Sequence, residues 1–397
     1  MELKPCSLIP STRAPAFAGG SCSGFRPTGV LEGVTGLPVG LHLRFLFAGT
    51  SNANGKLRRR RDCARSLWFI FLSLQLILAI GGPPLWAAER LTIATSALNM
   101  LTTPLWLAKD KGFFLKYGLD AEPIYIPSGT MALQALLSGD IKVAMAAGSP
   151  VVNANLQGAP VRIIAGNANF YPVAFFSAPE IRDPRDLRGK KVAVTRAGSS
   201  SYTATIILLR KFGLEEGKDY TILQLGSTQN RLVALTKGMI QGTTLSAPES
   251  IMAKNAGMKV LIPVNEMKRV GVTIQHQAVA VPDRALRESR SATKAFLMAY
   301  LAGVREVYRS KEATMQSLGK YTRISDPQVL SASYDESYEA IEKEGALNEE
   351  GIQVILNEIS KTDSRALKAR ASQFFDPTLL QELAKEGFIK SLWQGGK

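Results

Sequence analysis

The chain has 397 residues, of which 46% are hydrophobic, 20% charged and 8% aromatic, and this composition excludes a disordered chain, a fibrous rod and a polytopic membrane protein. The formal charge is +15, but residues 1–88 hold 10 Lys and Arg against 3 Asp and Glu, and the rest holds 38 basic against 30 acidic side chains. Because no long basic run follows residue 88, the charge does not indicate nucleic-acid binding.

Residues 57–88 have the order of a secretory signal peptide. Four arginines, Arg58 to Arg61, precede an apolar stretch of 14 residues at 67–80, and glycine, proline and small residues follow. This order is typical of an export signal, and 14 helical residues rise only about 21 Å, less than the membrane core. We therefore expect cleavage near Ala88 and a periplasmic product, with a retained anchor as the alternative. The sequence does not separate Sec from twin-arginine export.

Residues 1–56 do not fit upstream of such a signal. Glycine and proline account for 14 of these 56 residues, and no periodic apolar face is present. We interpret the segment as a non-native or disordered extension, with translation starting near Leu57. The three cysteines, Cys6, Cys22 and Cys63, all precede the expected cleavage point, so the mature chain would contain no disulfide.

From residue 90 onward, apolar β-type runs alternate with helical segments. A helix of 10 to 15 residues between successive strands is typical of βαβ units, so we predict an α/β fold with mainly parallel sheets. The predicted strands span 90–95, 121–127, 142–147 and 160–168 in a first run, and 190–195, 219–225 and 239–245 in a second run.

The two runs resemble each other. Residues 128–150 correspond to 226–248, and Gly139 and Gly238 within these segments are 99 residues apart. This period is too long for a solenoid and indicates one α/β unit used twice, although chance similarity between α/β units is the alternative. We expect a first lobe at 89–180, a second lobe at 181–280, and a return to the first lobe with C-terminal helices at 281–397.

The chain lacks the residues that most enzymes need. Only His276 and no cysteine would remain after maturation, and no GxGxxG, GxxxxGK[ST], GxSxG or HExxH motif is present. Nucleophilic triads and multi-histidine metal sites therefore lack partners. We predict no catalytic residue, no metal ligand and no cofactor, and we interpret His276 chiefly as a structural residue.

Small polar residues follow several predicted strands. Ligands of open α/β sheets bind beyond the carboxyl ends of the strands, and helix N-termini in these loops favour anions. An ordinary N-cap is the alternative for each loop taken alone. The candidate ligand-binding residues are Ser96, Ala97, Asn99, Ser128, Gly129, Gly148, Ser149, Asn167, Tyr171, Arg196, Gly198, Ser199, Ser200 and Ser246.

Arg196 is the candidate cation of this site. It follows the strand at 190–195 and precedes the sequence AGSSS, so we expect a guanidinium and a helix N-terminus to face the same point. An arginine can hold a carboxylate or a sulfonate with two hydrogen bonds. A solvated arginine at the rim is the alternative.

Three segments resemble a known family. LAKDKGFFLKYGLD (107–120), IRDPRDLRGKKVAVTRAGSS (181–200) and PESIMAKNAGMKVL (248–261) resemble the type II periplasmic solute-binding proteins, in the branch for nitrate, sulfonate, taurine and thiamine-pyrimidine precursors. The resemblance covers about 90–310. It implies two lobes joined by two crossings, which we place near 178–183 and 278–283, with a small-molecule ligand closed between them.

The resemblance also implies the partners and the function. We expect an exported, monomeric protein that captures a small anionic or heteroaromatic solute, of sulfonate, carboxylate or pyrimidine type, and delivers it to the permease subunits of an ABC importer. A sensory binding module for a membrane receptor and an enzyme of the pyrimidine-synthase type are the alternatives. The chain departs from the family pattern at Gln241, near which the family often has an acidic residue.

Overall fold

The computed structural model describes residues 89–394, which belong to one compact unit. The predicted extension at 1–56 and the predicted signal peptide at 57–88 lie outside the described residues. Within 89–394, none of the helices combines the length and the hydropathy that crossing a membrane requires.

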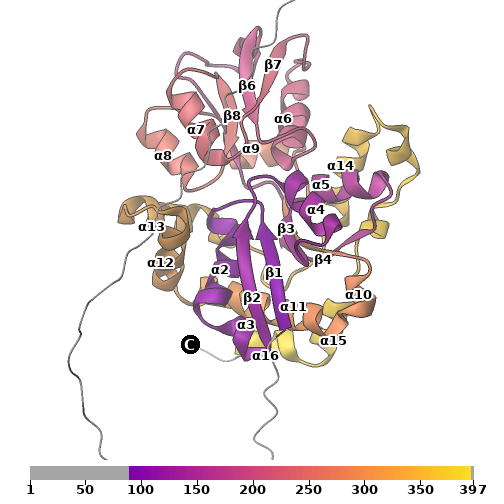
Figure 1. Cartoon of the computed structure of the whole chain (residues 1–397). Coiled ribbons are helices and arrows are strands. Elements are labelled where there is room, and N and C mark those ends of the chain that lie inside the picture. The colour runs from indigo at the N-terminus through magenta and orange to yellow at the C-terminus, as the bar shows by residue number, and fades with distance from the viewer. Residues whose placement is uncertain (1–88, 395–397) are drawn as a thin grey trace, which may run out of the picture. The chain divides into compact units, whose positions relative to one another are not determined.

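The described residues form two five-stranded sheets, each covered by helices (Figure 1). The first sheet has the order β2-β1-β3-β10-β4 and defines the first lobe. In this sheet β1 pairs in parallel with β2 and β3, whereas β10 pairs antiparallel with β3 and β4. Its strands are β1 (Glu89–Thr95), β2 (Leu119–Tyr125), β3 (Val143–Ala146), β4 (Val161–Ala168) and β10 (Gln277–Pro282).

The second sheet repeats this topology in the order β7-β6-β8-β5-β9 and defines the second lobe. Here β6 pairs in parallel with β7 and β8, and β5 pairs antiparallel with β8 and β9. The strands are β5 (Ala174–Ser177), β6 (Lys190–Val194), β7 (Tyr220–Gln224), β8 (Gly242–Leu245) and β9 (Lys259–Ile262). The shared order confirms the predicted α/β fold with mainly parallel sheets, and it agrees with the internal repeat.

The two crossings between the lobes lie earlier than the sequence analysis placed them. β5 belongs to the second sheet, so the first crossing falls between 168 and 174 rather than near 178–183. β10 belongs to the first sheet, so the second crossing falls between 269 and 277 rather than near 278–283. Each lobe thus receives one antiparallel strand directly after a crossing. Such a strand needs no crossover helix, so the βα pattern does not reveal it.

Helices cover both faces of each sheet, as a parallel arrangement requires. In the first lobe they are α2 (Thr103–Asp110), α3 (Phe113–Lys116), α4 (Gly129–Ser138) and α5 (Gly148–Leu156). In the second lobe they are α6 (Ser200–Lys211), α7 (Thr228–Thr236), α8 (Glu249–Asn255) and α9 (Val264–Arg269). After β10 the helices are α10 (Ala285–Glu288), α11 (Arg290–Arg309), α12 (Lys311–Thr322), α13 (Pro327–Ser337), α14 (Glu349–Ile359), α15 (Thr378–Lys385) and α16 (Phe388–Gln394). Short 3-10 helices span Met100–Thr102, Pro184–Leu187, Tyr338–Ala340, Ser364–Lys368 and Ala371–Phe374.

The helix α11 anchors the C-terminal segment to the first lobe. Its stripe of Phe296, Tyr300, Val304 and Val307 is completely buried, as the spacing of these residues predicts for one helix face. The helix packs against α2 and α3. Gly303 makes this close approach possible, because a Cβ atom there would lie 2.1 Å from the carbonyl oxygen of Pro104.

The C-terminal helices also contact the second lobe. Lys254 of α8 forms an ion pair with Glu336 of α13 at 2.6 Å, and Arg210 of α6 forms one with Glu358 of α14 at 2.5 Å. Both pairs are partly exposed, so each contributes only about 0–1 kcal/mol. They nevertheless connect the lobes at two separate places outside the crossings.

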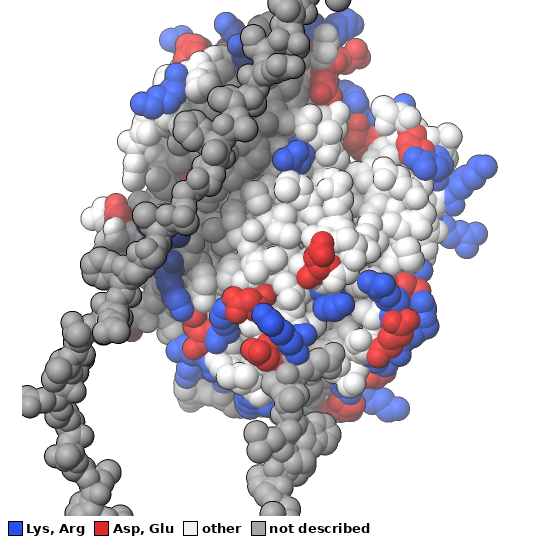
Figure 2. All heavy atoms as spheres, viewed as in Figure 1, with Lys and Arg blue, Asp and Glu red and all other residues white. Residues whose placement is uncertain are grey.

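Charged side chains of both signs are intermixed on the face of the molecule shown in Figure 2, with uncharged residues across its middle. A nucleic-acid footprint would instead gather basic side chains on one face. The face in view therefore agrees with the interpretation of the charge made from the sequence.

Candidate functional site

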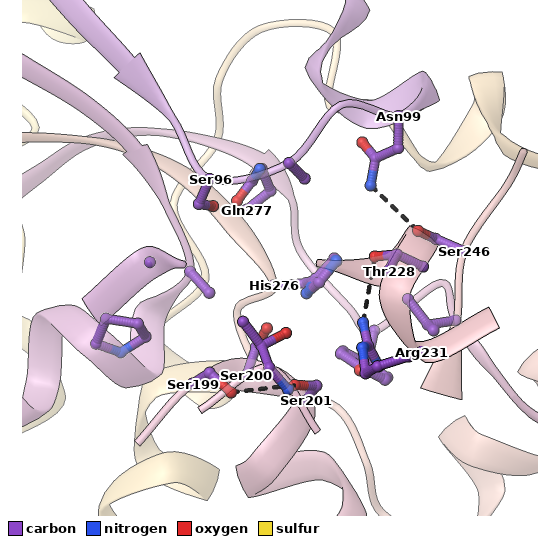
Figure 3. A pocket seen from close by; sticks show the side chains of 17 residues that line it. Ser96, Asn99, Ser199, Ser200, Ser201, Thr228, Arg231, Ser246, His276 and Gln277 are labelled. Atoms are coloured by element: carbon purple, nitrogen blue, oxygen red, sulfur yellow. Dashed lines mark hydrogen bonds between the residues drawn. The ribbon is translucent and has the colours of Figure 1, made fainter. Parts of the chain in front are cut away.

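A cavity of about 60 Å³ lies between the two lobes, and the loops that follow the parallel strands line it (Figure 3). Both lobes and both crossings contribute residues, as expected for a ligand site at the carboxyl ends of parallel strands. The lining residues are Ser96, Ala97, Asn99, Gly129, Ala147, Pro150, Tyr171, Val173, Thr195, Ser199, Ser200, Ser201, Thr228, Arg231, Ser246, His276 and Gln277.

Two helices of the second lobe begin at the cavity. Ser199 caps α6 by accepting a hydrogen bond from the backbone of Tyr202, and Ser227 caps α7 by accepting one from Asn230. Serine is favoured at these positions because its oxygen satisfies a free backbone N–H group. The remaining free N–H groups and the helix dipoles make this wall of the cavity favourable for negative charge.

Hydrogen bonds hold the two lobes together around the cavity. Asn99 of the first lobe donates from Nδ2 to Ser246 Oγ of the second lobe at 3.2 Å (Figure 3). Tyr171, in the first crossing, donates its hydroxyl to Thr244 Oγ1 at 3.1 Å. All four side chains are buried, so these bonds form away from bulk water and the lobes are closed.

Arg231 is a buried cation on the wall of the cavity. Its side chain is only 4% exposed. One terminal nitrogen donates three hydrogen bonds: to Thr243 Oγ1 at 3.1 Å, to the carbonyl oxygen of Thr244 at 2.5 Å, and to Thr244 Oγ1 at 3.2 Å. The other donates to Thr228 Oγ1 at 3.2 Å (Figure 3). All of these acceptors are neutral.

The charge of Arg231 has no counter-ion in direct contact. Its Nε is buried without a hydrogen-bond partner, and the guanidinium forms no ion pair with any carboxylate of the described residues. Burial lowers the pKa of Arg231 below its usual value, but an arginine stays protonated in proteins. Because buried charges are normally paired, this wall of the cavity is suited to an anion.

His276 and Tyr171 form an aromatic corner of the cavity. Their rings meet edge to face with centroids 4.7 Å apart. The Nδ1 atom of His276 is buried without a partner, and burial together with the charge on Arg231 lowers the pKa of His276 to about 4. The imidazole is therefore neutral near pH 7. The structure places His276 on the cavity as well as in the second crossing, beyond the structural role expected from the sequence.

The structure brings eight of the predicted ligand-binding residues to the cavity: Ser96, Ala97, Asn99, Gly129, Tyr171, Ser199, Ser200 and Ser246. Four others lie behind its wall and pack the first lobe. Ser128 caps α4, Asn167 donates to the carbonyl oxygen of Leu101 at 2.6 Å, and Ser149 is completely buried. A Cβ atom on Gly148 would lie 2.7 Å from Ile352, so this glycine serves packing.

The two remaining predicted residues, Arg196 and Gly198, do not line the cavity either. The Arg196 side chain is exposed, and its backbone carbonyl accepts a hydrogen bond from Ser199 Oγ at 2.6 Å. Gly198 accepts a hydrogen bond from Asn153 at 3.4 Å. The expectation that Arg196 faces the cavity was wrong. Thr195 lines the cavity, whereas Arg196, the next residue in the bend after β6, is exposed to solvent.

The sequence analysis missed nine lining residues: Ala147, Pro150, Val173, Thr195, Ser201, Thr228, Arg231, His276 as a cavity residue, and Gln277. For Arg231 a signal was present. It lies four residues after the N-cap Ser227, near the positive end of the α7 dipole, where a cation is unfavourable. A basic residue in this position indicates that another interaction requires it.

The described part of the chain contains no group of three or more His, Cys, Asp or Glu side chains that could hold a metal ion. Two α/β lobes that close on a polar cavity are the arrangement of the periplasmic solute-binding proteins. The chain belongs to one of their families: residues 99–313 match the sequence model described as NMT1/THI5 like.

A curated relative with a named ligand is distantly similar to this chain. The chain is 22% identical over 222 residues to the riboflavin-binding protein RibY of Chloroflexus aurantiacus. The aligned region covers 54% of this chain and 62% of that protein. The match thus spans less than two thirds of the length of this curated relative.

Solved structures share the fold. The alkanesulfonate-binding protein SsuA of Xanthomonas axonopodis pv. citri, bound to MOPS, has a TM-score of 0.59 at 19% identity, over 72% of this chain and 96% of that chain. The periplasmic nitrate-binding protein NrtA of Synechocystis PCC 6803 has a TM-score of 0.59 at 16% identity, over 75% of this chain and 89% of that chain. At these identities the likeness concerns the fold alone.

Proposed function

We propose that this protein is an exported periplasmic solute-binding protein that captures a small anion between its two lobes and delivers it to an ABC importer. The observation that carries this proposal is Arg231, a buried guanidinium on the cavity wall whose hydrogen-bond partners are all neutral. An anion in the cavity would supply the missing counter-charge. Export and the importer follow from the family resemblance.

The other polar groups of the cavity suit an oxygen-bearing anion. Ser199, Ser200 and Ser201 surround the beginning of α6, and Thr228 begins α7. These hydroxyl groups and the backbone N–H groups of the helix ends donate hydrogen bonds to oxyanions without carrying charge. No carboxylate is among the residues that line the cavity. A nitrate, a short sulfonate or a short carboxylate would therefore find donors on several sides.

The size of the cavity favours a small ligand. Its volume of about 60 Å³ is well below the roughly 300–1,000 Å³ typical of sites for drug-sized molecules. A larger solute would need a more open arrangement of the lobes, and the two crossings at 168–174 and 269–277 would then act as the hinge.

A heteroaromatic solute is the second candidate. The edge-to-face pair of Tyr171 and His276 on the cavity wall and the riboflavin-binding relative favour it. The pair is already packed in the closed arrangement, where Tyr171 is 2% exposed. A ring system would therefore have to displace it, which makes the anion the better-supported ligand.

The test is a binding screen with nitrate, methanesulfonate, acetate and riboflavin as probes. A ligand at 100 times its Kd stabilises the folded protein by about 2.7 kcal/mol, which is measurable as a shift in Tm. We expect an anion to bind and Arg231→Gln to weaken that binding tenfold or more, whereas Arg196→Gln, which removes the same charge from an exposed position, leaves it unchanged.

Two results would contradict this proposal, the first at the ligand and the second at Arg231. Binding of riboflavin with no response to any of the three anions would favour the heteroaromatic candidate. Anion binding of equal strength in the Arg231→Gln and Arg196→Gln variants would remove Arg231 from the site. A circular-dichroism spectrum of each variant confirms that it is folded.

A further inference from the structure

Glu249 is a second buried charge-bearing group, close behind the cavity. It is the first residue of α8 and follows the loop that carries the cavity residue Ser246. Its side chain is 1% exposed, and Oε2 is buried with no hydrogen-bond partner. The helix α8 packs against α7, which carries Arg231. A buried carboxyl group with an unsatisfied oxygen is unfavourable by itself, so its presence at this position needs an explanation.

Arg231 is the cation that acts on Glu249. The charge of Arg231 opposes the effect of burial on the Glu249 carboxyl group, and Glu249 in turn favours the charged form of Arg231. The two groups lie too far apart for an ion pair. Glu249 is therefore a counter-ion at a distance, beyond the reach of a hydrogen bond.

Other charged groups on α8 and on the elements packed against it have partners of their own. Lys254 of α8 pairs with Glu336 of α13, and Ser250 donates to the same carboxylate. Lys259 of β9 donates to the carbonyl oxygen of Arg182, and Asp335 of α13 pairs with Lys311. Tyr334 of α13 donates its hydroxyl to Val307. Burial and the charge of Glu249 raise the pKa of Tyr125 in β2 to about 12, so this phenol is neutral near pH 7.

We propose that Glu249 is the internal counter-ion of Arg231 and that it takes up a proton when the cavity captures an anion. This inference rests on the proposed function, since it concerns the same anion and the same guanidinium. In the empty protein the Glu249 carboxylate partly balances the charge of Arg231. A bound anion takes over that task, and two negative groups then share one buried cation.

Electrostatics makes the proton uptake follow from the binding. A like charge nearby disfavours the ionised form of a carboxyl group, and in a poorly solvated interior the group neutralises rather than stay charged. Burial raises the pKa of Glu249 to about 7, so the carboxyl group is close to half-protonated near neutral pH. A bound anion raises this pKa further. The proton comes from the solvent, and no bond other than the O–H bond of the carboxyl group forms.

The consequence is a pH-dependent affinity. Below about pH 7 Glu249 is already neutral and the anion affinity is constant. Above it, binding requires the uptake of a proton, so the affinity falls by up to tenfold per pH unit until the pKa of the anion-bound protein is reached. His276 does not contribute to this change because its pKa of about 4 keeps it neutral throughout, and Tyr171 has a raised pKa.

The experiment measures Kd by calorimetry at about pH 6 and about pH 8.5 for nitrate, methanesulfonate and acetate, which are anionic at both values. We expect the wild-type protein to bind at least tenfold more weakly at the higher pH. Glu249→Gln, which has the same shape but cannot ionise, should bind with one affinity at both pH values. The control is Glu266→Gln, which removes a carboxylate that is paired with Arg269 on α9. This variant should keep the wild-type ratio between the Kd values at the two pH values.

A second measurement on the unmodified protein makes the test independent of the folding of the variant. Addition of a binding anion at about pH 7.5 should increase the infrared band of a protonated carboxyl group, and calorimetry in buffers of different ionisation enthalpy should report net proton uptake. A wild-type affinity that differs less than twofold between the two pH values, or a ratio unchanged in Glu249→Gln, overturns this inference and leaves the proposed function standing. No binding of any of the three anions at either pH overturns both.

Discussion

Asn99 and Ser246, which are 147 residues apart in the sequence, share a buried hydrogen bond of 3.2 Å between the first and the second lobe. Asn99 also caps the short helix at Met100–Thr102 by accepting from the backbone of Thr102. Its side chain is therefore held within the first lobe independently of its bond to the second lobe. The pair links the geometry of a helix cap to the closure of the cavity.

Removal of this contact should weaken ligand capture. Ser246→Ala deletes the acceptor and leaves the amide of Asn99 without its partner, which costs about 1–3 kcal/mol for a buried donor. Because the bond joins the two lobes in the closed arrangement, we expect the Kd of the ligand to rise at least fivefold. We also expect the radius of gyration of the bound protein, measured by X-ray scattering, to increase. Ser138→Ala, which removes an exposed hydroxyl on α4, should change neither quantity.

The contact between α11 and α2 should tolerate no side chain at Gly303. A Cβ atom there would lie 2.1 Å from the carbonyl oxygen of Pro104 and 3.1 Å from Ala108, so Gly303→Ala must push the helices apart. We expect a loss of about 1–3 kcal/mol in the free energy of unfolding, measured by urea denaturation. The control is Ser291→Ala on an exposed position of α11, and equal stability of the two variants would contradict the packing.

His276 should make the folded protein less stable in acid. Its pKa is about 4 in the folded protein against about 6.5 in an unfolded chain, so the unfolded chain binds more protons between these values. Stability contributed by the neutral imidazole is present above about pH 6.5 and is lost as the pH falls toward 4. His276→Gln should therefore lose less stability than the wild type between pH 7 and 5 in denaturant titrations. Parallel curves for the two proteins would contradict the assignment.

Glu249 should have the opposite effect in the same experiment. Its pKa is about 7 in the folded protein against about 4.3 in an unfolded chain, so the folded protein binds more protons between these values. Stability is highest while Glu249 is protonated in both states and falls as the pH rises from about 4.3 to about 7. Glu249→Gln should abolish this fall and gain stability over the wild type toward pH 7. If the difference in the free energy of unfolding between the two proteins stays constant from about pH 4.3 to 7, the pKa of Glu249 is not raised in the folded protein.

The local pattern of the sequence was enough to predict most of the scaffold. Strands such as β1 and β6 are short apolar runs bounded by helix-capping residues, and the signal is local because each residue reports its own burial. The same reasoning located Ser96, Asn99 and Ser199, since a polar loop after a parallel strand faces the ligand edge of its sheet in any fold of this class.

The antiparallel strands β5 and β10 could not be assigned in this way. Each is a fully buried apolar run directly after a crossing, and which sheet such a strand joins depends on pairing with residues far away in the sequence. The pattern of β5 is compatible with either lobe. Only the pairing of Phe175 with Thr244 of β8 places it in the second sheet.

The sequence by itself determined that the chain after residue 88 alternates strands and helices in two similar halves and carries small polar loops suited to an anion. Only the tertiary structure decided which cation serves the cavity. Arg196 and Arg231 are equivalent in chemistry. Arg196 follows a strand and its side chain is exposed, whereas Arg231 lies on a helix and its side chain is buried. Such differences arise from the packing of one lobe against the other, and a local sequence pattern does not record them.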